Sequence, residues 1–180
     1  MLSDEDRRTL LDLARRTAEA AARGIPAPDL TRPSGALREK GAAFVTLRVD
    51  GQLRGCVGHV QAAEPLWTCV RDMAYATAND ERFPPLAPSD LPGLAVEISL
   101  LSPLVPLRPE DIQVGTHGLY ARLGRRAGLL LPQVAVEWGW DARQFLRRTY
   151  EKAGLDPDEP DAELFGFTVE KLQSFPETTG

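Results

Sequence analysis

The first apolar pattern along the chain has a helical period. Over residues 3–23, apolar and small side chains recur every three or four positions, which places them on one face of a helix. Ser3 stands where a helix N-cap is expected, and Gly24 followed by Pro26 is typical of a helix end. The pattern therefore predicts a first helix over 3–23, followed by a proline-rich connection over 25–35.

A strand pattern follows on both sides of Asp50-Gly51, a dipeptide that strongly favours a two-residue β-hairpin turn. The two predicted strands are Ala42–Val49 and Gln52–Val60. Side chains of directly opposed residues share one face of a sheet. Regular pairing across the turn places Val49 opposite Gln52, Leu47 opposite Arg54 and Val45 opposite Cys56. We therefore expect Cys56 beside Val45, on the face that also carries Leu47 and Arg54.

The rest of the chain alternates between helix and strand signals. The predicted elements are a helix from Pro65 to about Asn79, a strand over Leu94–Leu101, strands near 118–124 and 128–132, a helix from the capping pair Asp141 and Gln144 to a stop at Gly154 and Leu155, and an edge strand within 164–175. Strands joined by hairpins favour an α/β (α+β) fold with an antiparallel or mixed sheet flanked by helices. The length of 180 residues suits a single domain over 1–180.

Composition and charge narrow the class of protein. Apolar residues make up 43% of the chain and charged residues 26%, as in globular proteins. The formal net charge of −5 argues against a surface that coats phosphate backbones. Two cysteines are too few for a disulfide scaffold, the N-terminus lacks signal-peptide features, and apolar runs are too short to span a bilayer. We expect a cytoplasmic protein that does not bind membranes.

Candidate chemistry is densest at Cys56, which Gly55 and Gly58 flank within Leu53–Gly58. Glycine inside a strand marks a bulge or a close approach by another group, so the thiol side is expected to be open to a ligand or a second backbone. Arg54, two residues earlier, points the same way along a regular strand and would stabilise a thiolate. The alternative is that Cys56 is a small buried core residue.

Two histidines and three charged residues complete the candidate cleft. His59 and His117 are candidate proton carriers, although residues three apart in a regular strand face opposite sides, so a direct pair of Cys56 with His59 requires a bulge. The ligand-binding candidates are Arg54, Asp80, Arg82 and Glu97. Asp80 and Arg82 would otherwise form an ion pair that fixes the loop before Pro84-Pro85, and Glu97 would otherwise be solvated. No spacing resembles a recognised metal-binding motif, so no metal ligand is assigned, and the sequence does not identify a cofactor.

Five motifs occur in an order that resembles one known family. They are Leu53–Gly58, Asn79–Leu86, Glu97–Pro103, Gly115–Leu119 and Leu130–Ala135. The chain resembles the family of the AMME chromosomal region candidate gene one protein over about residues 8–155. Val57 replaces the isoleucine usual in the first motif, and Tyr150 stands where the family has a cysteine.

The resemblance implies an antiparallel sheet flanked by helices with a smaller attached lobe, at about 105–140 in this chain. It also implies partners, because relatives occur fused to or alongside a Memo-like protein and a radical S-adenosylmethionine enzyme. The favoured hypothesis is an accessory or ligand-binding module in a modification pathway, which leaves open whether the chain is an enzyme. The alternatives are a thiol-dependent enzyme that uses Cys56 and, as the weakest, an RNA-binding protein with an arginine patch. That patch would comprise Arg122, Arg125, Arg126, Arg143, Arg147 and Arg148.

Overall fold

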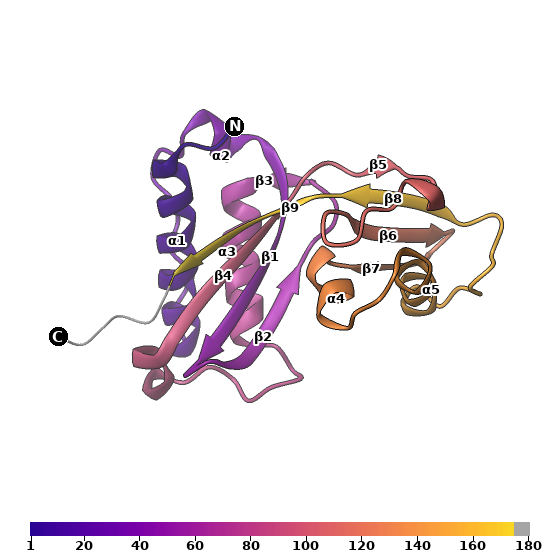
Figure 1. Cartoon of the computed structure of the whole chain (residues 1–180). Helices are drawn as coiled ribbons and strands as arrows, with labels where there is room; N and C mark the ends of the chain where they lie inside the picture. Colours follow the sequence, from indigo (N-terminus) through magenta and orange to yellow (C-terminus); the bar gives the residue numbers. More distant parts are fainter. Residues whose placement is uncertain (175–180) are drawn as a thin grey trace. The chain divides into compact units, whose positions relative to one another are not determined.

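The computed structural model describes residues 1–174, which form helices and antiparallel strand pairs in two compact units (Figure 1). Of the described residues, unit 1 comprises 1–100 and 170–174, and unit 2 comprises Leu101–Val169. The predicted α+β class is confirmed. No helix within the described residues is long and apolar enough to cross a membrane.

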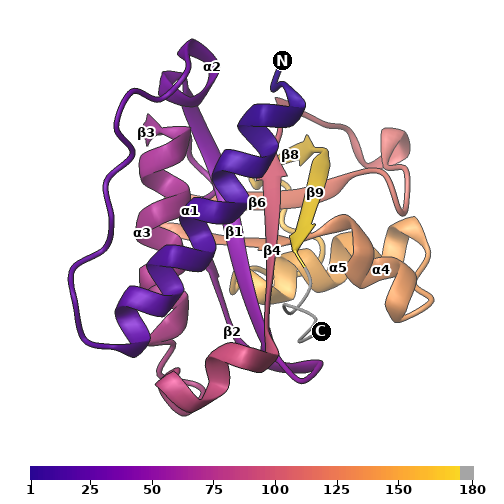
Figure 2. The same cartoon turned by 90° about the vertical axis from the view of Figure 1, so that its left-hand side faces the viewer.

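Three helices belong to unit 1: α1 (Asp4–Ala22), α2 (Gly35–Arg38) and α3 (Leu66–Ala78). The predicted cap of α1 is confirmed, because Ser3 and Asp6 form a reciprocal capping box. Figure 2 shows α1 and α3 side by side on one face of the sheet. Apolar side chains of both helices pack against that face to form the core of unit 1.

The sheet of unit 1 has the strand order β2 (Gln52–Gly58), β1 (Lys40–Val49), β4 (Leu94–Leu101) and β9 (Val169–Ser174), with the short β3 (Glu64–Pro65) paired to the start of β1. A 3-10 helix, η1 (Pro88–Gly93), leads into β4. Alternate residues such as Val45, Leu47 and Ile98 are buried against the helices. The intervening residues lie on the other face, called here the open face of unit 1, which includes Thr46, Arg48 and Glu97.

The hairpin of β1 and β2 differs from regular pairing by one residue. Asp50 and Gly51 have positive φ angles of 49° and 80°, as the predicted two-residue turn requires, and Val49 pairs with Gln52 as expected. The register then shifts between Leu47 and Arg48. Arg48 pairs with Leu53, Leu47 pairs with Gly55 and Thr46 pairs with Cys56.

Arg54 is the extra residue of this bulge. The predicted pairs of Leu47 with Arg54 and of Val45 with Cys56 are therefore wrong. An insertion of one residue reverses which face every later side chain meets, because the side-chain period of a strand is two. The side chain of Cys56 consequently lies on the open face beside Thr46, whereas the side chain of Val45 lies on the face that the helices cover.

Unit 2 contains a second antiparallel sheet with the order β5 (Val105–Pro106), β8 (Glu163–Phe167), β6 (Gly118–Leu123) and β7 (Arg126–Leu130). Its helices are η2 (Pro109–Asp111), α4 (Pro132–Glu137) and α5 (Ala142–Lys152). The core centres on Phe145 of α5, which is fully buried. The predicted capping box of Asp141 with Gln144 is confirmed, and the helix closes with a bond from the Leu155 N–H to the Tyr150 carbonyl.

The boundaries of three predicted strands are corrected. The strand expected over 128–132 ends at Leu130, since Pro132 begins α4. The single edge strand expected within 164–175 is two strands: β8 lies between β5 and β6, and β9 is the edge of the other sheet. The hairpin strand expected to reach Val60 ends at Gly58. Phe175 lies outside the described residues.

Candidate functional site

The thiol of Cys56 lies on the open face of unit 1 and is partly exposed. Thr46 on the neighbouring strand β1 donates a hydrogen bond from Oγ1 to Cys56 Sγ at 3.3 Å. Directly opposed residues whose backbone groups do not bond each other bring their side chains close together. The backbone of Cys56 meets this condition, because its N–H and carbonyl both bond outward to other residues.

Asp80 and Arg82 hold that outward-facing backbone. The Cys56 N–H donates to Asp80 Oδ2 at 3.1 Å, and Arg82 Nη2 donates to the Cys56 carbonyl at 2.8 Å. The two side chains also form the expected ion pair, with Arg82 Nη2 and Asp80 Oδ2 2.7 Å apart. Because β2 is an edge of the sheet, this Asp80–Arg82 clamp occupies polar groups that no strand pairs with.

The clamp is electrostatically favourable for both partners. The hydrogen bonds from Arg82, with help from the Cys56 N–H, hold the pKa of Asp80 far below its usual range. The Asp80 carboxylate in turn raises the pKa of Arg82. Asp80 is buried while Arg82 is largely exposed, so the pair anchors a surface strand to the end of α3.

Both glycines beside Cys56 have close neighbours where a Cβ would stand. A Cβ on Gly55 would lie 2.5 Å from the carbonyl oxygen of Thr77, so this glycine admits the end of α3 on the face away from the thiol. A Cβ on Gly58 would lie 2.3 Å from the ring of Phe44, which fills the space beside it. A second backbone approaches both glycines closely, because the carbonyl oxygen of Ala43 would also lie 2.5 Å from a Cβ on Gly58.

The predicted cationic neighbour of the thiol is engaged elsewhere. Arg54, in the bulge, donates to Asp90 Oδ2 at 2.9 Å, and the same carboxylate oxygen accepts from the Ala87 N–H. Arg54 therefore fixes η1 to the hairpin. The structure brings Asp80 and Arg82 to the backbone of Cys56, whereas the guanidinium of Arg54 is taken up by Asp90.

The two histidines lie in different units. His59 follows β2 directly and is exposed; its backbone N–H bonds to the Ala43 carbonyl, and within residues 1–174 no hydrogen bond joins it to Cys56. His117 belongs to unit 2, where its Nδ1 accepts the Gln113 N–H at 3.2 Å. With Nδ1 used as an acceptor, the neutral imidazole carries its proton on Nε2, which leaves Nε2 as a hydrogen-bond donor.

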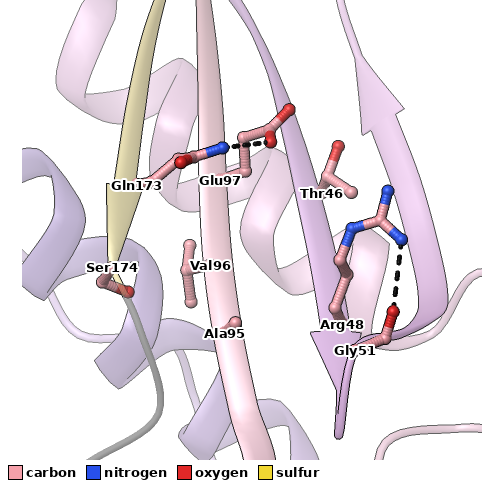
Figure 3. A pocket seen from close by; sticks show the side chains of 8 residues that line it. All are labelled: Thr46, Arg48, Gly51, Ala95, Val96, Glu97, Gln173 and Ser174. Atoms are coloured by element: carbon pink, nitrogen blue, oxygen red, sulfur yellow. Dashed lines mark hydrogen bonds between the residues drawn. The ribbon is translucent and has the colours of Figure 1, made fainter.

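A hollow of about 260 Å³ lies on the open face of unit 1 (Figure 3). Its lining residues come from the hairpin, β4 and β9: Thr46, Arg48, Gly51, Ala95, Val96, Glu97, Gln173 and Ser174. Glu97 was expected from the sequence, and its carboxylate accepts from Gln173 Nε2 at 2.8 Å and pairs with Lys171 Nζ at 3.2 Å. Thr46 joins this hollow to Cys56, since it lines the one and bonds to the other.

The sequence pattern does not single out Thr46, Arg48 or Gln173. The signal that could have found Thr46 and Arg48 is the polar half of the alternation in β1, read with the bulge taken into account. Gln173 lies far along the chain from β4, and only the pairing of β9 brings it to Glu97.

Two other kinds of site are less well supported by the described residues. Residues 1–174 contain no group of three or more histidine, cysteine, aspartate or glutamate side chains that could hold a metal ion. In the predicted arginine patch, Arg122 pairs with Glu163, and Arg147 and Arg148 both pair with Glu151. These ion pairs reduce the positive charge that the patch would offer to RNA.

Known proteins resemble the chain over most of its length. The family model described as AMMECR1 matches residues 11–172. A protein of Methanothermobacter thermautotrophicus is 40% identical, with 94% of each chain covered, and the protein TK0174 of Thermococcus kodakarensis is 42% identical over 94% of this chain and 90% of its own. The crystal structure of the uncharacterized protein PH0010 from Pyrococcus horikoshii superposes with a TM-score of 0.87 at 36% identity, covering 97% of this chain and 95% of that one.

Proposed function

The chain belongs to the AMMECR1 family, and on that premise we propose that it is an accessory, ligand-binding module. Its partners would be a Memo-like protein and a radical S-adenosylmethionine enzyme of the same modification pathway. The binding surface is the open face of unit 1, which carries Cys56, Thr46 and Glu97. The family resemblance supports the partners, and the geometry around Cys56 supports the kind of role.

The observation that carries this proposal is the Asp80–Arg82 clamp. General acid–base catalysis needs titratable side chains whose polar atoms can reach a reacting group. The polar side-chain atoms of Asp80 and Arg82 instead form hydrogen bonds with the backbone of Cys56 and with each other. A clamp of this kind makes an edge strand rigid and presents its side chains in a fixed arrangement, which suits recognition.

The test is complex formation by the full chain with the Memo-like protein and the radical S-adenosylmethionine enzyme from the same host. We expect co-elution in size-exclusion chromatography. Leu53→Glu should weaken the complex at least about tenfold, because Leu53 pairs with Arg48 on the open face and is 38% exposed. The matched control is Val105→Glu in unit 2, where an exposed apolar residue also becomes acidic. Failure of both partners to co-elute with the unchanged chain would overturn the proposed partnership.

One observation favours a thiol-dependent enzyme as the second candidate. The Thr46 hydroxyl donates from Oγ1 to Sγ of the partly exposed Cys56 at 3.3 Å, and this bond orients the sulfur on the open face. A reactive thiol would alkylate faster than a free thiol at the same pH, and Thr46→Val would slow it by removing the donor at nearly constant volume.

Alkylation of Cys56 by iodoacetamide separates the two candidates. The measurement is made in a Cys69→Ser background, although Cys69 competes little because burial raises its pKa to about 11. The accessory-module proposal predicts labelling no faster than that of a free thiol, with Thr46→Val having little effect. Fast labelling that Thr46→Val slows would favour the enzyme.

A further inference from the structure

We propose that the hollow on the open face of unit 1 binds a small organic carboxylate, with Arg48 as its anion-binding group. The inference rests on the proposed function, because it names the class of ligand that the open face would take. The charge, the hydrogen-bonding groups and the size of the hollow all favour such a ligand.

The charges in the hollow leave one cation without a counter-charge. Glu97 is compensated, because Lys171 Nζ lies 3.2 Å from Oε1 and Gln173 Nε2 donates to Oε2 at 2.8 Å. Arg48 is exposed and makes one long hydrogen bond, from Nη1 to the Gly51 carbonyl at 3.5 Å. Within residues 1–174 it forms no ion pair. The net charge of these three side chains is thus one positive, which favours a monoanion.

Two hydroxyl groups that line the hollow, those of Ser174 and Thr46, could donate hydrogen bonds to a ligand. The Ser174 hydroxyl is buried and makes no hydrogen bond among the described residues. A buried polar group without a partner costs free energy, which a ligand acceptor would recover. The Thr46 hydroxyl donates its hydrogen bond to the sulfur of Cys56, which is a weak acceptor. An oxygen atom of a ligand is a stronger acceptor and would compete well for that donor. Arg48 adds the planar fork that matches a carboxylate.

Size and apolar lining select an organic ligand of few atoms. The volume of about 260 Å³ is below the roughly 300–1,000 Å³ of pockets that hold drug-sized molecules. Ala95, which Figure 3 labels beside Arg48 and Glu97, supplies apolar surface in the hollow, whereas the side chain of Val96 is buried in the core. A short aliphatic acid would place its carboxylate on Arg48 and its carbon chain against Ala95.

The test is a titration of the full chain followed by nuclear magnetic resonance, with sodium butyrate as the probe. Butyramide serves as the neutral isostere, and sodium chloride and inorganic phosphate at equal ionic strength serve as the ionic controls. We expect saturable shifts of the Arg48 Nε–H, the Thr46 amide and the Gln173 side-chain amide with butyrate. Butyramide and phosphate should bind at least about tenfold more weakly.

Arg48→Gln should weaken butyrate binding at least about tenfold, whereas Arg16→Gln on α1 should leave it unchanged. Arg16 is the matched control because it is exposed and pairs only locally, with Asp12 at 3.6 Å. Equal binding of butyrate by the Arg48→Gln variant, equal binding of phosphate, or no saturable shift at all would overturn the inference.

The two proposals fail separately. Loss of butyrate binding while the partner complex still forms removes the carboxylate site and leaves the accessory module. Butyrate binding that depends on Arg48, without a partner complex, removes the partnership and leaves the ligand site.

Discussion

At the scale of single residues, Gly55 shows how close packing sets the position of Cys56. A Cβ at this position would lie 2.5 Å from the Thr77 carbonyl oxygen and 2.9 Å from Thr77 Cγ2, distances that force the end of α3 away from β2. We predict that Gly55→Ala lowers the free energy of unfolding by about 2 kcal/mol, as overpacking does. Urea unfolding of the two proteins measures this difference.

Gly35→Ala is the control for that substitution. Nothing lies within 4 Å of a Cβ at Gly35, which begins α2 with an ordinary φ angle, so alanine there should be neutral or slightly stabilising. An equal loss of stability in both variants would contradict the close approach at Gly55.

Asp80 gives a prediction about pH. Its pKa is depressed in the folded chain, so its contribution to stability is present above the unfolded value of about 3.9 and is lost as the pH falls from there towards the folded value. Asp80→Asn should cost about 2 kcal/mol at pH 7, because it weakens charged hydrogen bonds to Arg82 and Cys56. The difference between the two proteins in urea unfolding should shrink progressively below about pH 4.

An exposed aspartate supplies the comparison for Asp80. Asp12 on α1 forms an exposed pair with Arg16 at 3.6 Å, and such pairs contribute about 0–1 kcal/mol. Asp12→Asn should therefore change stability little at any pH. A constant cost of Asp80→Asn from pH 7 to pH 3 would show that the charge of Asp80 does not stabilise the fold.

At the scale of elements, the sequence predicts the larger helices and most of the strands, but not the face on which Cys56 lies. Periodicity and capping residues are local signals, and they place α1, α3, α5 and the turn at Asp50-Gly51 correctly. The bulge at Arg54 is set by long-range contacts instead: Asp90 holds Arg54, and α3 packs against Gly55. Gly55 alone marks a bulge or a close approach without saying which residue is inserted.

The same reason explains which site residues the sequence finds. Asp80 and Arg82 stand two residues apart, so a local ion pair between them is predictable. Their hydrogen bonds to the backbone of Cys56 are not predictable from the sequence, because the whole of α3 separates Cys56 from both residues along the chain. The hollow is less predictable still, since it needs β9 to pair beside β4 and bring Gln173 to Glu97.

At the scale of the whole molecule, the described residues form two buried cores that share no residue. The core of unit 1 is built on α1, α3 and the sheet around β1, and the core of unit 2 is built on α5 and the sheet around β6. Stability within a protein varies between such cooperative parts, and hydrogen exchange measures the variation. A substitution that weakens one core should therefore raise exchange mainly within its own unit.

Asp141→Ala tests this separation. The change removes the N-cap of α5, where Asp141 accepts the Gln144 N–H at 2.8 Å, and should cost about 1 kcal/mol. We expect faster hydrogen exchange in α5, β6 and β7, with α1, α3 and β1 unchanged. Ser3→Ala removes the corresponding cap of α1 and should give the reverse pattern. If each variant instead raised exchange equally in both units, the two cores would unfold as one cooperative domain, because local opening in either unit would then require the other to open as well.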